Sequence, residues 1–434
     1  MSQSDQTPNA RSGAVAGGGY VLALLLLLNI LLVLDKIVLN TLVEPIRQEF
    51  GLSDTQIGAV MGLVYAIFMG IAGLPLGMLA DRTNRRNLVA ACLAAWSVMT
   101  AACGMAQNLT QLILARIGVG IGEAGGGPGA LSIIADLFEP KRRARAMAVF
   151  GMGTQLAALV NLTIMTQITH HWGWRVTLFA ASVPGLLLSL TMLLTMKEPR
   201  RGGADGLSAR QKAPPLGETL RFIAGQRSLV HLLIGATLSY VIIGGMGSWH
   251  FTFLVRSHGL KLHEVGPFLG LSIAVLGVIA NLSSGFLSDF FGAKDERYRA
   301  WLIAGGAATA VAVGAFSLLA STAFGALASV AAFAAIGTFW FAATAAMIQG
   351  LVEVRMRSTL AGLLFLLSNL IGYGLGPMLI GAVSDVLRPQ FGEDALRYAM
   401  LAVVTVNGWA ALHFALAAPT LQRDIQKARG AAAV

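Results

Sequence analysis

The chain has 434 residues, of which 56% are hydrophobic and 12% are charged, and its mean hydropathy is +0.70. A soluble globular protein carries about twice that charged fraction, so the composition excludes an ordinary soluble domain. The net charge of +10 does not indicate nucleic-acid binding, because the basic residues lie in short segments between apolar runs, where membrane proteins concentrate them.

Apolar runs long enough to cross a bilayer, which takes about 20 residues each, recur along the whole chain. We therefore predict an all-α membrane protein with 12 transmembrane helices. The expected spans are 20–43, 56–80, 88–106, 110–137, 145–168, 175–196, 228–255, 264–290, 300–320, 323–350, 359–386 and 396–418.

The longest polar stretch, 197–227, divides these spans into two groups of six. Most Lys and Arg residues fall in the two termini and in the loops on the same face, so the positive-inside rule predicts that both termini are cytoplasmic. The expected parts are a cytoplasmic N-terminal tail (1–19), a six-helix bundle (20–196), a cytoplasmic linker (197–227), a second six-helix bundle (228–420) and a cytoplasmic tail (421–434).

The two groups of spans resemble an internal repeat. A shift of 208 residues superimposes glycines and an aspartate in and next to the second span on those in and next to the eighth: Gly51 on Gly259, Gly58 on Gly266, Gly62 on Gly270, Gly77 on Gly285 and Asp81 on Asp289. Duplication of a membrane unit in this way is common among secondary transporters and predicts two pseudo-symmetric bundles.

Two motifs resemble those of the major facilitator superfamily. Residues 77–86, GMLADRTNRR, resemble the signature loop between its second and third spans, and residues 112–120, LILARIGVG, resemble the arginine motif of its fourth span. The resemblance covers nearly the whole chain. It implies a transporter in which spans 1, 4, 7 and 10 line a central cavity.

Within that superfamily, several segments are similar to the Spinster-type lipid transporters: LPLG at 74–77, GIGEAG at 120–125, DLFEP at 136–140 and WGWR at 172–175. Organic-anion symporters of the superfamily share a similar Gly-x-x-Glu-Ala element. This chain has Asp35-Lys36 where both groups often have Asp-Arg. The glycine-proline element of drug/proton antiporters is absent from residues 150–163, which disfavours multidrug efflux.

Four charged residues lie within the predicted spans, where each costs about 2.5–3.5 kcal/mol on insertion scales: Asp35, Lys36, Arg116 and Glu123. Asp35 and Arg116 lie about 12 Å and about 9 Å from the outer ends of their spans, so they could form an ion pair. Glu123 is on the same face as Arg116 and about 10 Å deeper, near the midplane where transporters bind their substrates.

A carboxylate in this setting can carry a proton, because burial favours its neutral form and a nearby cation favours its charged form. We predict that Asp35 and Glu123 couple transport to protons, and that Lys36, Arg116 and Glu123 contact the substrate. The alternative is a static Asp35–Arg116 pair that only joins spans 1 and 4. Five of the seven histidines are expected near span ends, in loops or in the last span, and none of these five is predicted to carry protons: His231, His250, His258, His263 and His413.

The resemblance also implies a cytoplasmic gate. In it, Arg82 would reach Asp136 and Asp81 would face the start of span 11. Asp289 and Asp385 are the expected partners in the second half. The alternative is that these charges simply face water at the span ends.

The resemblance implies a proton-coupled secondary transporter for an amphipathic anionic lipid, such as a lysophospholipid or sphingoid phosphate. The alternatives are a proton-coupled organic-anion symporter and a membrane sensor that kept the fold without transport. No enzyme motif, cofactor or metal site is expected. We expect a monomer in a bacterial inner membrane, with its substrate, protons and membrane lipids as partners.

Overall fold

The structure is a computed structural model that describes residues 18–199, 214–353 and 356–431. The first half contains α1 (Gly18–Phe50), α2 (Asp54–Gly58), η1 (Ala59–Leu63), α3 (Val64–Arg82), α4 (Arg85–Met105), α5 (Leu109–Glu123), α6 (Gly126–Leu137), α7 (Pro140–Gly151), α8 (Gly153–Val160), η2 (Asn161–Met165) and α9 (Thr166–Thr195). The second half contains α10 (Leu216–Ala224), α11 (Arg227–His258), α12 (Leu262–Gly292), α13 (Arg297–Leu319), α14 (Ala323–Gly350), α15 (Arg357–Leu367), η4 (Ser368–Leu375), α16 (Gly376–Phe391), η5 (Gly392–Asp394), α17 (Ala395–Val404) and α18 (Val406–Ala431).

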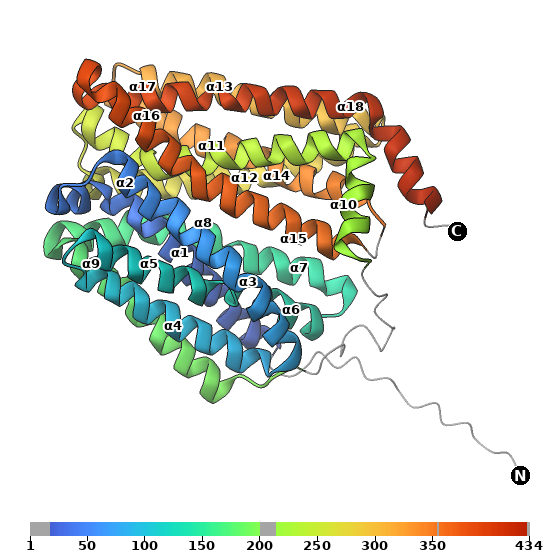
Figure 1. The fold of residues 1–434 in the computed structure, drawn as a ribbon, viewed down its shortest axis with the longest axis horizontal. Helices are drawn as coiled ribbons and strands as arrows, with labels where there is room; N and C mark the ends of the chain where they lie inside the picture. The colour runs from blue at the N-terminus through green and yellow to red at the C-terminus, as the bar shows by residue number, and fades with distance from the viewer. Residues whose placement is uncertain (1–17, 200–213, 354–355, 432–434) are drawn as a thin grey trace, which may run out of the picture.

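The described residues form helices and no strands, which confirms the all-α class. Figure 1 shows the helices of the first half beside those of the second half, most of them along the long axis of the molecule. We call the two ends of this axis the α2 end, where α2 lies against α16, and the α10 end, where α10 and the end of α18 lie.

Nine helical stretches of the described residues are long and apolar enough to cross a membrane. Two of these, 145–195 and 359–427, contain 51 and 69 residues and include turns at Gly173 (φ 80°) and Gly392 (φ 57°). The helices α5 and α6 are separated by a two-residue break at Ala124 and Gly125. Neither helix is long enough by itself to be included among these membrane-crossing stretches. The number of twelve spans and the side on which the termini lie remain predictions.

Two glycines related by the sequence repeat end long helices in the same way. Gly51 follows α1 with φ 61°, and Gly259 follows α11 with φ 63°. Only glycine adopts this left-handed conformation without a steric penalty, so both positions require it. The chain therefore reverses direction through the same kind of glycine turn after the first long helix of each half.

Two further pairs of repeat glycines lie where the halves touch. A side chain on Gly58 would meet the carbonyl of Pro377 in α16 at 2.6 Å, and one on Gly62 would meet the carbonyl of Gly374 in η4 at 2.5 Å. In the second half, a side chain on Gly266 would overlap the carbonyl oxygen of Leu162 in η2, and one on Gly270 would meet the Cβ of Leu162 at 3.0 Å. Each half thus presents one glycine face to the other half, and these close approaches define two seams between the halves.

Candidate transport site

A cavity of about 230 Å³ lies between the two halves of the chain. The first half contributes side chains from α1, η1, α3, α5, α8 and η2, and the second half contributes side chains from α11, α12, α14 and η4. Among the described residues, the charged side chains on its wall are Lys36 and Arg116. Both belong to the first half, so the charge of the cavity is concentrated on one side.

Irregular helical turns border this cavity. The three π-helical turns η1, η2 and η4 contribute Met61, Asn161, Leu162, Asn369 and Tyr373 to its wall. A π turn inserts an extra residue into a helix and rotates the segment that follows, and such turns often occur at functional sites. The turns therefore decide which side chains of spans 2, 5 and 11 reach the cavity.

Glu123 lies just behind the cationic wall. Its Oε2 accepts a hydrogen bond from the Tyr65 hydroxyl and is 4.0 Å from the Nζ of Lys36. Glu123 is 3% exposed and Arg116 is 2% exposed. The predicted grouping of Lys36, Arg116 and Glu123 is therefore present, with Lys36 as the nearest cation to the carboxylate.

The predicted ion pair between Asp35 and Arg116 is wrong. Among the described residues, Asp35 forms no ion pair, and its Oδ1 accepts a hydrogen bond of 2.8 Å from Thr100 in α4. Adjacent residues of a helix point about 100° apart. Because Lys36 faces the cavity, the side chain of Asp35 is turned toward α4. The depth of Asp35 in its span did not reveal this direction.

Tyr65 is a site residue that sequence analysis missed. Its ring lies under two cations, 5.6 Å from the Nζ of Lys36 and 5.0 Å from the guanidinium carbon of Arg116. Its hydroxyl donates to Glu123, so one side chain contacts all three charged groups. A tyrosine in an otherwise apolar span was the only available signal, since aromatic residues are also common in lipid-facing positions.

Two polar atoms of this group have no hydrogen-bond partner among the described residues. They are the Nε of Arg116 and the Oε1 of Glu123, and both are buried. Buried polar atoms are nearly always paired with protein or water. The site therefore has unused capacity for one acceptor at Arg116 and one donor at Glu123.

At the α10 end, Arg85 pairs with Asp136, and no described contact joins Arg82 to Asp136, which corrects the prediction that Arg82 would reach it. Arg85 is 3% exposed, and its Nη1 donates to Asp136 while its Nε donates to Glu198 at 2.8 Å. Arg82 is exposed at the end of α3. The side chain of Asp81 lies outside the described part of the structure.

The two predicted gate carboxylates of the second half lie at opposite ends of the molecule. Asp289 is at the α10 end, where its 87% exposed side chain is 3.6 Å from the Nη2 of Arg299. Asp385 is at the α2 end, so it cannot belong to the same gate as Asp136 and Asp289, and its predicted grouping with them is wrong. Span 11 runs from the α10 end to the α2 end, and Asp385 is close to the end of this span at the α2 end.

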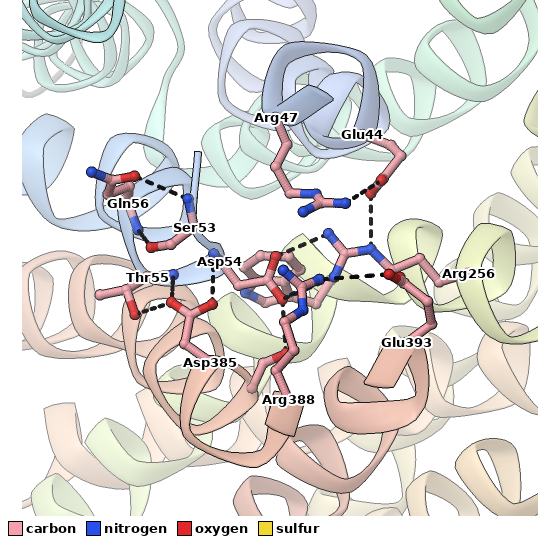
Figure 2. Close-up of polar contacts among 12 residues, drawn as sticks. Glu44, Arg47, Ser53, Asp54, Thr55, Gln56, Arg256, Asp385, Arg388 and Glu393 are labelled. Atoms are coloured by element: carbon pink, nitrogen blue, oxygen red, sulfur yellow. Dashed lines mark hydrogen bonds and ion pairs between the residues drawn. The ribbon is translucent and has the colours of Figure 1, made fainter. Parts of the chain in front are cut away.

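A cluster of charged residues joins the halves at the α2 end (Figure 2). Arg256 of α11 lies at its centre. Its Nη1 and Nη2 each donate to one oxygen of Asp54 at 2.9 Å, and its Nε donates to Glu44 at 2.8 Å. Bidentate pairing of a guanidinium with a carboxylate is among the stronger polar contacts in proteins. We call Glu44, Asp54, Arg256, Ser384, Asp385 and Arg388 the α2-end cluster.

Within this cluster, the second half surrounds the start of α2. Asp54 is fully buried, accepts a 2.7 Å hydrogen bond from Ser384, and lies 4.0 Å from the Nη2 of Arg388. Asp385 accepts hydrogen bonds from the backbone amides of Asp54 and Thr55, at 3.0 and 2.8 Å, and so caps α2 from another helix. The sequence alone did not reveal these contacts, because they join residues up to 331 positions apart in the chain.

Comparison with known proteins identifies the family. The sequence model of the Major Facilitator Superfamily matches residues 25–377. The chain belongs to this superfamily. It is therefore an integral membrane protein and a secondary transporter, not a catalytic enzyme, and it is of the Spinster type.

Individual relatives agree along nearly the whole chain. An MFS-type efflux pump of Mycolicibacterium smegmatis is 30% identical, over 97% of this chain and 96% of its own. Human protein spinster homolog 1 is 28% identical, over 94% of this chain and 82% of its own. The crystal structure of a bacterial homologue of the human lysosomal transporter Spinster, inward-facing and unoccupied, is 28% identical with a TM-score of 0.81 and covers 95% of this chain and 99% of that one.

Proposed function

We propose that this transporter moves an amphipathic anion, of the lysophospholipid or sphingoid phosphate class, together with protons. The observation that carries the proposal is the division of the cavity wall, with Lys36 and Arg116 on one side and mostly apolar side chains elsewhere. A cationic group can hold the anionic head of a lipid, while apolar side chains accommodate its chain. The similarity to Spinster proteins supports a transporter of this type, and the lipid class is what the resemblance to the Spinster-type lipid transporters implies.

The proposed coupling follows from competition for the cations. An ionised Glu123 occupies Lys36, which is 4.0 Å away. Once Glu123 is protonated, Lys36 and Arg116 are available to an external anion, and the carboxylic acid keeps its hydrogen bond to Tyr65. Proton and anion would then bind at the same time and move in the same direction. Asp35, buried beside Thr100, is the second proposed proton carrier.

In the proposed transport cycle, the two ends of the molecule close in turn. We place both termini, the linker 197–227 and the α10 end in the cytoplasm, with twelve spans in two bundles, 20–196 and 228–420. In this arrangement the α2-end cluster closes the outer side. Asp81, Arg82, Asp289 and the Arg85–Asp136 pair are the candidates for closing the cytoplasmic side in the opposite state. We propose that a monomer in a bacterial inner membrane carries out this cycle.

The test uses purified protein in liposomes that contain a trapped pH dye. Lysolipids and small organic anions are added separately, and vesicles with Glu123→Gln serve as the leak control. Proton flux evoked by lysolipids and absent from the control supports the proposal. Adding the substrate either inside or outside the vesicles also gives the direction of transport.

Other outcomes identify the alternatives. Flux with small organic anions alone would assign the protein to the organic-anion symporters. Binding without turnover of any ligand would indicate a sensor that kept the fold. Lysolipid-evoked flux that survives both Asp35→Asn and Glu123→Gln would rule out these two carboxylates as the coupling groups and leave Asp35 with a structural role.

A further inference from the structure

His250 lies on the wall of the cavity contributed by the second half. It is 4% exposed and packs against the ring of Phe333, with 5.2 Å between ring centroids. It precedes the end of α11 by eight residues, or about 12 Å of helix, so it is deeper than the span-end position expected from sequence.

The Nε2 of His250 is buried and has no hydrogen-bond partner among the described residues. Leaving such an atom unpaired is unfavourable, and most buried polar side-chain atoms have a partner. On a cavity wall, the missing partner can come from whatever occupies the cavity. A neutral imidazole nitrogen can donate or accept one hydrogen bond, so it suits an uncharged hydroxyl or carbonyl group.

The charges on the wall indicate which part of a ligand would reach this histidine. Lys36 and Arg116 belong to the first half, and among the described residues the second half contributes no Asp, Glu, Lys or Arg to the wall. An anionic group placed at the two cations leaves the uncharged part of the ligand facing α11 and α14. Among the described residues that line this part of the wall, His250 is the one whose buried side-chain nitrogen has no partner.

We propose that His250 is a specificity-determining residue, which binds an uncharged hydroxyl or ester group of the substrate at a distance from its anionic group. This inference rests on the proposed function and narrows it. The preferred substrate would carry both groups, as lysophosphatidates do, whereas a simple alkyl phosphate carries only the anionic one.

The test compares two ligands that share a phosphate group and an unsaturated chain of the same length. These are 1-oleoyl lysophosphatidate, which has a glycerol hydroxyl and an ester, and oleyl phosphate, which has neither. Their Kd values are measured by titration calorimetry on the full chain in detergent, for the wild type and for His250→Phe. We expect the wild type to bind the lysophosphatidate about tenfold more tightly, since tenfold in Kd corresponds to about one well-made hydrogen bond. His250→Phe should lose this preference by weakening only lysophosphatidate binding.

The chain offers a matched control in His258→Phe. His258 is on the same helix and its Nε2 is also buried without a partner among the described residues, but it lies outside the cavity wall. This variant should keep the wild-type preference. His250→Gln retains a hydrogen-bonding side chain, should keep part of the preference, and serves if His250→Phe does not fold.

Each result has a definite meaning. Loss of the preference in His250→Phe but not in His258→Phe supports the inference. An unchanged preference in His250→Phe, or equal Kd values for both ligands in the wild type, would overturn it while leaving the anion-binding function in place. Binding of neither ligand by the wild type would overturn the lipid function and the inference with it.

Discussion

The guanidinium of Arg256 makes two hydrogen bonds of 2.9 Å to the buried carboxylate of Asp54, and so connects α11 of one half to α2 of the other. The same guanidinium reaches Glu44 of α1 through its Nε. A single side chain therefore holds three helices at the α2 end. Its contacts must break if this end is to open, which makes the pair a direct determinant of the conformational equilibrium.

The first prediction concerns this pair. Arg256→Gln should open the α2 end, because removing one partner of a buried ion pair costs about 3–5 kcal/mol in general, and here it leaves the buried Asp54 without its bidentate partner. The measurement is the distance between spin labels at Gln48 and Lys261, both exposed near this end. The mean distance should increase.

Arg47→Gln is the control for this experiment. Arg47 pairs with Glu44 within α1 and does not join the two halves through a described contact. It should leave the label distances unchanged. Equal distance distributions in the wild type and Arg256→Gln would mean that the α2 end is held closed by packing alone.

The second prediction concerns the cap that Asp385 places on α2. Asp385→Ala removes the acceptor for the amides of Asp54 and Thr55, and loss of a side chain that caps a helix N-terminus costs about 0.5–2 kcal/mol. The variant should unfold at a lower temperature in detergent, as followed by circular dichroism. Glu393→Ala, whose side chain is 66% exposed in the same region, should keep the wild-type Tm. The same Tm for both variants would show that the cap does not stabilise the fold.

The third prediction concerns the glycine seam. A methyl group on Gly62 would approach the carbonyl oxygens of Gly374 and Tyr373 to 2.5 and 2.6 Å, so Gly62→Ala must separate η1 from η4. We expect a wider separation of the labels at Gln48 and Lys261 and slower transport. Gly73→Ala is the matched control on α3, since nothing lies within 4 Å of its added methyl group. Wild-type label distances in Gly62→Ala would contradict the close packing of this seam.

The fourth prediction separates the two arginines near the end of α3. Arg85→Gln should destabilise the protein by about 3 kcal/mol, because it leaves Asp136 and Glu198 without their shared buried partner. Arg82→Gln should change stability little, because its side chain is exposed. Thermal unfolding of both variants in detergent checks this. A larger loss of stability in Arg82→Gln than in Arg85→Gln would favour the Arg82–Asp136 pairing that the motif implies.

The fifth prediction concerns the cations of the cavity. Lys36→Gln should weaken binding of 1-oleoyl lysophosphatidate by roughly tenfold or more, since a hydrogen bond to a charged group contributes about 1.5–3 kcal/mol. Lys36→Arg, which keeps the charge and matches the Asp-Arg pair common in the family, should retain most of the affinity. Titration calorimetry gives both values. Equal affinity in Lys36→Gln and the wild type would remove Lys36 from the substrate site.

Periodic hydrophobicity, loop charges and two motifs were sufficient to predict the helical class and the superfamily. The repeat predicted from Gly51 and Gly259 also corresponds to matching backbone conformations, since both have positive φ. These features are local, or depend only on the order of residues along the chain, so the sequence contains them directly. The depth of Lys36, Arg116 and Glu123 in their helices could be counted for the same reason.

The direction in which each side chain points was decided by the tertiary structure. Asp35 contacts Thr100 because Lys36 faces the cavity, and Arg85 replaces Arg82 at Asp136 because the turn after α3 directs it inward. The α2-end pair of Asp54 and Arg256 joins residues 202 positions apart. Such contacts depend on the rotation of helices and on the packing of the two halves, and a single sequence specifies neither except through the complete fold.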